Sequence, residues 1–122
     1  MNIAVVFGSH RTEGKNKEIE IAIKEAGFSH IFDFVRLAES NITPTQTPVE
    51  VDDDFDDILT RLSRADILLL VVPVYCPYPA KFAALMERLL DVSYQNPNKP
   101  LKGKPAVIFY YCSTKICDET PL

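Results

Sequence analysis

The sequence lacks most features that mark secreted, membrane-spanning or nucleic-acid-binding proteins. Its three cysteines form no disulfide framework, and their odd number indicates reduced thiols and a cytoplasmic protein. The longest apolar run, residues 67–74, contains a proline and is too short to cross a bilayer. Met1 leads directly into an apolar segment predicted to be a strand, so we expect no signal peptide. The net charge of −4, without a cluster of Lys or Arg, argues against a nucleic-acid partner.

Two common nucleotide-binding motifs are absent as well. A P-loop has about four residues between its first glycine and the Gly-Lys-[Ser/Thr] end. Here five residues separate Gly8 from Gly14, and Asn16 replaces the hydroxyl residue that would hold magnesium. The dinucleotide motif G-x-G-x-x-G does not occur. The first loop is therefore not expected to hold a nucleoside triphosphate or a dinucleotide pyrophosphate.

The first loop does contain groups suited to a phosphate. Residues 3–7 are apolar and largely β-branched, which predicts a buried strand, and a helical pattern follows the loop. Ser9 and Thr12 offer hydroxyls, Arg11 a planar guanidinium and Asn16 an amide. A helix N-terminus adds a positive dipole. We expect a terminal monophosphate here, as on a mononucleotide; the alternative is a solvated connection that binds nothing.

Apolar segments alternate with helical patterns along the chain, which predicts a single α/β domain over residues 1–122. Strands are expected at residues 3–7, 31–37, 67–72 and 106–111, and helices at 16–26, after residue 54 and from about residue 80. Strands joined through helices form a parallel sheet covered on both faces. Right-handed crossovers with a switch point give the strand order 2-1-3-4, with the charged second strand at an edge.

The first helix carries more detailed expectations. Glu20 and Lys24 are spaced for an i,i+4 ion pair, and Gly27 is placed to end the helix. Its expected inner face is apolar and consists of Ile19, Ala22, Ile23 and Ala26.

Five aspartates lie within residues 52–57, directly before the second helix. Their density suggests a divalent cation, but Asp is also favoured at helix caps and first turns, where it meets the positive end of the helix dipole. The spacing of Phe55, Ile58 and Leu62 supports the helix. We expect a helix start and no metal site. Replacing Asp52 or Asp53 by Asn is then expected to cost at most about 1 kcal/mol.

In a sheet of this order the carboxyl ends of strands 1, 3 and 4 surround one crevice. Their loops are the phosphate-suited loop after residue 8, the proline- and tyrosine-rich residues 73–79, and the small polar residues 112–115. Such walls suit a planar heteroaromatic ring with a phosphate tail. Cys76 and Cys112 follow apolar strands and are expected to pack rather than to react.

Residues 6–16, 65–75, 85–89 and 101–106 together share their order and spacing with one known family. In these stretches the sequence resembles the NADPH-dependent FMN reductases of the flavodoxin-like fold. The resemblance implies an enzyme that binds FMN and moves a hydride from NADPH or NADH to the flavin and on to an acceptor, without a protein general base. It also implies a set of FMN-binding residues, namely Ser9, His10, Arg11, Thr12, Gly14, Lys15, Asn16, Pro73, Val74, Tyr75, Cys76, Cys112, Ser113 and Thr114.

The sequence departs from this family in three places. The iron–sulfur branch has a cysteine cluster after the second strand, but residues 41–51 contain no cysteine. Residues 76–79 replace the small hydroxyl residues usual there. The sequence also stops shortly after the fourth strand, so we expect no fifth strand, and a homodimer or higher homo-oligomer that covers residues 106–111. The alternatives to an enzyme are an FMN-binding electron carrier and a flavin-less interaction subunit.

Overall fold

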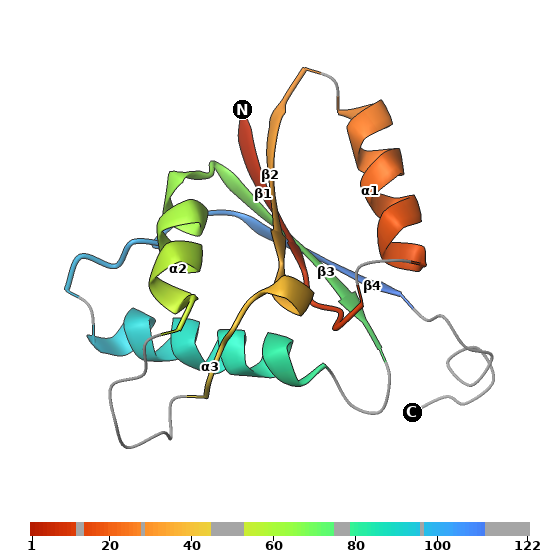
Figure 1. Cartoon of the computed structure of the whole chain (residues 1–122). Helices are drawn as coiled ribbons and strands as arrows, with labels where there is room; N and C mark the ends of the chain where they lie inside the picture. The colour runs from red at the N-terminus through yellow and green to blue at the C-terminus, as the bar shows by residue number, and fades with distance from the viewer. Residues whose placement is uncertain (12–13, 28, 45–52, 75–78, 96, 112–122) are drawn as a thin grey trace.

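The computed structural model describes residues 1–11, 14–27, 29–44, 53–74, 79–95 and 97–111. A central sheet carries helices on both sides (Figure 1). None of the described helices is both long and apolar enough to cross a membrane. In chain order the elements are β1 (Asn2–Phe7), α1 (Lys15–Ala26), β2 (Ile31–Arg36), the short 3-10 helix η1 (Leu37–Glu39), α2 (Phe55–Arg64), β3 (Ile67–Pro73), α3 (Ala80–Gln95) and β4 (Ala106–Tyr111).

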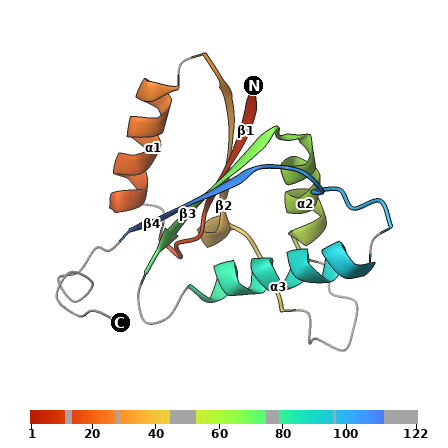
Figure 2. The ribbon, with the colours of Figure 1, turned by 180° about the vertical axis from the view of Figure 1, so that it is seen from behind.

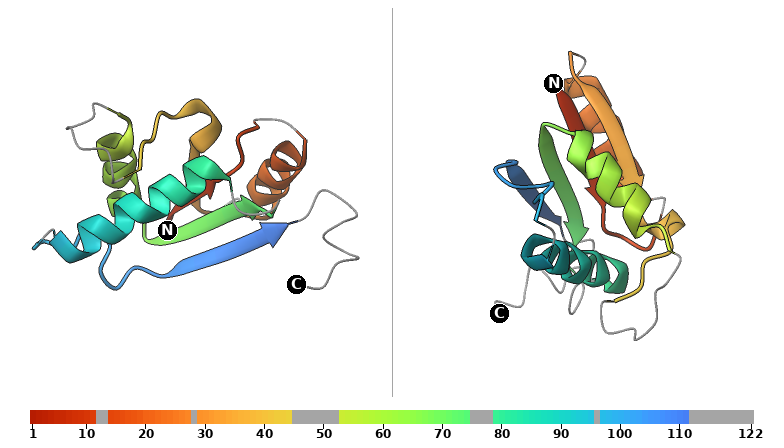
Figure 3. Two further views of the ribbon diagram at one scale, coloured as in Figure 1. Left: turned by 90° about the horizontal axis from the view of Figure 1, so that it is seen from below. Right: turned by 90° about the vertical axis from the view of Figure 1, so that its left-hand side faces the viewer.

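The four strands form one parallel sheet in the order β2-β1-β3-β4, which confirms the predicted topology. β1 and β3 occupy the centre, and Val5 pairs with Phe34 of β2 on one side and with Leu69 of β3 on the other. The two central strands are mostly buried because both faces of the sheet are covered there. β2 and β4 lie at opposite edges (Figures 2 and 3), and β2 has the Asp and Arg residues typical of an edge strand.

Helices α2 and α3 cover one face of the sheet, and α1 covers the other (Figures 1 and 3). The larger core lies under α2 and α3, where Ile58, Leu62 and Leu85 are buried against alternate residues of the strands. The smaller core lies under α1 and has Val5 and Val71 at its centre. The α1 face therefore buries less apolar surface than the other face.

The inner face of α1 differs from the apolar face predicted from the sequence. Ala22 and Ala26 are exposed, whereas Asn16 and Glu20 are buried. The helix is turned so that residues 16, 19, 20 and 23 face the sheet, a stripe with helical spacing in which two of the four are polar. Both polar side chains have partners there, described below. Burying the methyl groups of Ala22 and Ala26 would contribute little free energy compared with the contacts of Asn16 and Glu20.

Helix α2 begins directly after the aspartate-rich segment, which confirms the predicted helix start. The Oδ1 atom of Asp53 accepts the Phe55 amide at 3.1 Å. Its Oδ2 atom accepts hydrogen bonds from Arg88 of α3 at 2.7 Å and from the Thr43 amide at 3.1 Å. The residue at the N-cap position, Asp54, makes no capping bond with its side chain but accepts the Asn41 amide at 2.6 Å.

These aspartates therefore connect the start of α2 with α3 and with the segment after η1. They do more than the helix capping predicted from the sequence. Within the described residues no group of three His, Cys, Asp or Glu side chains is arranged to hold a metal ion; Asp52 lies outside those residues.

Candidate phosphate-binding site

The carboxyl ends of the strands meet at one edge of the sheet, beside the first residues of α1 and α3 (Figure 1). The chain leaves β1 at Gly8, whose amide donates to the Val71 carbonyl of β3 at 2.8 Å. A Cβ atom at Gly8 would lie 3.2–3.3 Å from the Phe82 side chain of α3. Glycine thus lets the loop pass close to α3 at the point where it leaves the sheet.

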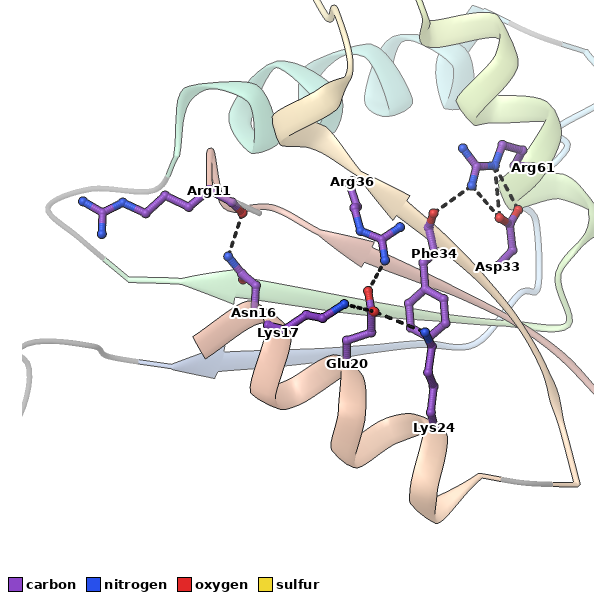
Figure 4. Close-up of polar contacts among 9 residues, drawn as sticks. All are labelled: Arg11, Asn16, Lys17, Glu20, Lys24, Asp33, Phe34, Arg36 and Arg61. Atoms are coloured by element: carbon purple, nitrogen blue, oxygen red, sulfur yellow. Dashed lines mark hydrogen bonds and ion pairs between the residues drawn. The ribbon is translucent and has the colours of Figure 1, made fainter. Parts of the chain in front are cut away.

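The first turn of the loop is held by a side chain. Ser9 is 1% exposed, and its Oγ atom accepts the Arg11 amide at 3.0 Å. This is a local hydroxyl-to-backbone turn, which orders the loop without a regular element. His10 and Arg11 are exposed on it, and the Arg11 guanidinium extends away from α1 (Figure 4).

Asn16 closes the loop from the other side. Its Nδ2 atom donates to the Arg11 carbonyl at 2.8 Å (Figure 4). Its Oδ1 atom accepts the hydroxyl of Tyr111, the last residue of β4, at 2.5 Å. Asn16 is 6% exposed, so the side chain predicted to contact a phosphate is used within the protein.

The N-terminus of α1 supplies the donors for an anion. Its N-cap is Gly14, with φ of 78° and no side chain to bond the first amides of the helix. These amides and the helix dipole favour a negative group. Lys15 is exposed there and pairs with Glu18 at 3.5 Å. The helix amides, the exposed Lys15 and the exposed Arg11 guanidinium are groups with the chemistry to bind a phosphate, although the Arg11 side chain extends away from α1 in this structure.

The buried carboxylate of Glu20 lies next to this loop and is surrounded by cationic side chains. Only its pair with Lys24 was predicted from the sequence. Glu20 contacts Lys17 at 3.3 Å, Lys24 at 3.2 Å and the Arg36 guanidinium at the end of β2 (Figure 4). Burial alone would raise the pKa of Glu20, but hydrogen bonds from both lysines and the charge of Arg36 hold it below its usual value. Three cations around one carboxylate leave a local surplus of two positive charges. A hollow of about 10 Å³, lined by Phe7, Arg11, Asn16, Glu20 and Arg36, connects this cluster to the loop.

The other predicted site residues divide into those described and those outside the description. Pro73 is buried at the end of β3, and the amide of half-buried Val74 donates to the Tyr111 carbonyl at 2.8 Å. The remaining predicted residues lie outside the described residues and are Thr12, Tyr75, Cys76, Cys112, Ser113 and Thr114. Tyr111, Glu20 and Arg36 were missed. The only sequence signal for Tyr111 was its place at the end of an apolar strand.

A four-stranded parallel sheet in this order, with helices on both faces, defines a flavodoxin-like α/β fold. Residues 1–116 match the family of NADPH-dependent FMN reductases. The chain belongs to that family.

The comparisons with individual proteins agree with this assignment. The chain is 33% identical over 119 residues to an iron-sulfur flavoprotein of Methanosarcina thermophila, covering 85% of this chain and 59% of the relative. The flavoenzyme NAD(P)H:(acceptor) oxidoreductase FerB of Paracoccus denitrificans superposes with a TM-score of 0.68 at 18% identity, over 89% of this chain and 59% of FerB. RosB, solved with a bound flavin-phosphate intermediate, gives 0.73 at 14% identity, over 92% of this chain and 52% of RosB. These two structures support the fold, and the chain spans little more than half the length of the relatives.

Proposed function

We propose that the chain binds FMN and acts as an NAD(P)H-dependent oxidoreductase. The observation that carries the proposal is the loop before α1, where Ser9 and Asn16 hold the Arg11 backbone and the side chains of Arg11 and Lys15 are exposed. The surplus positive charge around Glu20 adds to the attraction for a phosphate. Membership of the FMN reductase family supports the same cofactor.

The residues of this chain bind and orient the cofactor. Bound FMN would accept a hydride from a nicotinamide and pass the electrons to an acceptor, so the protein needs no general base of its own. The α1 amides and Arg11 would hold the phosphate, while Pro73 and Val74 would stand at the ring end of the crevice. The exposed Arg11 guanidinium can form a bidentate pair with phosphate oxygens.

The experiment compares FMN with riboflavin, which has the same ring and no phosphate. The wild-type chain should bind FMN far more tightly, and Arg11→Ala should lose one or two charge-assisted bonds, which corresponds to a loss of affinity of at least about tenfold. Arg64→Ala is the matched control, because Arg64 lies beside Asn2 at the opposite end of the sheet. Equal affinity of the wild type for the two flavins would contradict the proposal.

Turnover separates an enzyme from an electron carrier. With FMN added, the protein should oxidise NADPH or NADH, and comparing the two will give its preference. A carrier would bind FMN equally well but oxidise neither. Arg11 favours the reductase, because carriers of this fold tend to use a Thr-rich phosphate loop without Arg. The odd number of cysteines supports a reducing, cytoplasmic location.

A second copy of the chain is the proposed partner of β4. Four consecutive residues of this strand, Val107, Ile108, Phe109 and Tyr110, are each 46–55% exposed. Its outer edge pairs with no other strand within the described residues. Two identical edges can pair across a twofold axis, which satisfies the strand hydrogen bonds of both and covers the apolar side chains. A homodimer is therefore the simplest way to bury this strand.

A further inference from the structure

Tyr111 stands where two of the loops around the proposed FMN site begin. It is the last residue of β4 and pairs with Pro73, the last residue of β3. Val5, which faces α1, pairs with Leu69, and Leu69 pairs with Val107 of β4. Because side chains alternate along a strand, Tyr111, four residues after Val107, also lies on the α1 face of the sheet. It packs with the smaller core there and reaches across β3 towards α1.

The hydroxyl and the backbone carbonyl of Tyr111 bond to two different segments of the chain. Its hydroxyl donates to Oδ1 of Asn16 at 2.5 Å, which fixes the start of α1. Its carbonyl accepts the Val74 amide at 2.8 Å, which fixes the chain as it leaves β3. One residue thus sets the position of the phosphate end of the crevice relative to its ring end.

The orientation of the Asn16 amide follows from its partners. The Arg11 carbonyl can only accept, so the nitrogen of Asn16 must face it and the oxygen must face Tyr111. The Tyr111 hydroxyl must then be the donor. Both polar atoms of the buried Asn16 side chain therefore have protein partners, and Arg11 is held at its amide by Ser9 and at its carbonyl by Asn16.

We propose that Tyr111 and Asn16 are positioning residues for phosphate recognition. The bridge from Tyr111 through Asn16 to the Arg11 carbonyl holds Arg11 and the start of α1 in the positions that receive the phosphate. The inference rests on the proposed FMN binding and assigns Asn16 a supporting place rather than a direct contact. Residues that are already held in place before binding lose less conformational entropy when the ligand arrives, so the bridge contributes to affinity without touching the ligand.

The test is Tyr111→Phe, which removes one hydroxyl and keeps the ring in its core. The control is Tyr110→Phe, which removes the neighbouring hydroxyl on the opposite face of the strand. The quantity measured is the ratio of the riboflavin Kd to the FMN Kd for each protein, obtained by titration with the thermal unfolding midpoint recorded beside it. We expect Tyr111→Phe to lower this ratio about tenfold, mainly through weaker FMN binding, and Tyr110→Phe to leave it within about twofold of the wild type. Asn16→Ala should lower the ratio at least as much as Tyr111→Phe.

The possible results separate this inference from the proposed function. If the ratio of the riboflavin Kd to the FMN Kd is near one for the wild type, the protein does not recognise the phosphate, and both the proposed function and the positioning role are refuted. A high wild-type ratio that Tyr111→Phe leaves unchanged would overturn the positioning role alone. Equal weakening of FMN and riboflavin binding, with a lower unfolding midpoint, would show that Tyr111 only stabilises the fold and would also overturn it.

Discussion

The ion pair between Asp53 and Arg88 should make stability depend on pH below the neutral range. The Asp53 side chain is 2% exposed and Arg88 lies 2.7 Å away, with its guanidinium also 4.3 Å from the centre of the Phe55 ring. Burial alone would raise the pKa of Asp53. Hydrogen bonds from Arg88 and from the Phe55 and Thr43 amides outweigh burial and lower this pKa from 3.8 to about 2.

The size of the effect follows from that pKa. A fall from 3.8 to about 2, at about 1.4 kcal/mol per pH unit, corresponds to roughly 2–3 kcal/mol of the free energy of unfolding. Because the folded-state pKa is lowered, this contribution is fully present above the unfolded pKa. It is lost as pH falls from about 5 towards 2. The value exceeds the 1 kcal/mol or so of a helix cap, since a buried charge pair is added to the cap.

The perturbation is Asp53→Asn, which keeps the shape and one acceptor but removes the charge. At pH 7 it should lower the free energy of unfolding by about 2 kcal/mol. The assay is urea denaturation followed by circular dichroism, which suits a chain without tryptophan. Asp56→Asn, an exposed change in the first turn of α2, is the control and should cost less than about 1 kcal/mol.

The pH series completes the test. The difference between wild type and Asp53→Asn should shrink as pH falls from 5 to 2, because the wild-type carboxylate becomes protonated there. If the free energies of unfolding of Asp53→Asn and the wild type differ by less than about 0.5 kcal/mol at pH 7, the ion pair stabilises the protein no more than an exposed pair does. That result would refute the reasoning.

Two other predictions follow from the cation cluster and from β4. Glu20→Gln should destabilise the protein by about 2 kcal/mol at pH 7, and more than Glu18→Gln, because Glu20 is buried among three cations whereas the Glu18 side chain is 71% exposed. Urea denaturation measures the free energy of unfolding of both variants, and an equal loss in the two would contradict this prediction. Light scattering at micromolar concentration should give about twice the 13.8 kDa chain mass, and Val107→Lys should shift the protein to monomer. A monomeric wild type would exclude β4 pairing.

The topology could be predicted because the signals for it are local. Residues 3–7 and 67–72 are continuous apolar runs, which only a strand covered on both faces accommodates in a small α/β domain. The charges of Asp33 and Arg36 marked β2 as an edge strand. Glu20 and Lys24 were spaced for an ion pair, which the structure contains. In each of these cases the pattern lies within one element and can be recognised without knowing which distant residues it contacts.

The orientation of α1 could not be predicted because long-range bonds decide it. Apolar periodicity selected Ala22 and Ala26, whose methyl groups gain little on burial. Asn16 is buried instead by its bond with Tyr111, which is 95 positions further along the chain. Asp53 was likewise interpreted as a local cap, since its partner Arg88 is 35 positions away. Single-sequence patterns do not carry such pairings.

The polar burial of this domain is concentrated where FMN is proposed to bind. Among the described residues, the polar or charged residues buried as whole residues are Ser9, Asn16 and Glu20, all between the end of β1 and the middle of α1. The buried carboxylate of Asp53 lies apart from them, at the start of α2. A buried polar side chain costs free energy unless it is hydrogen-bonded, and all three have partners. Apolar residues would fill these positions at less risk to stability, as they do under α2 and α3. At the carboxyl edge of the sheet the buried polar side chains hold the Arg11 backbone and the start of α1, where Arg11 and Lys15 are exposed and where we propose that the phosphate binds.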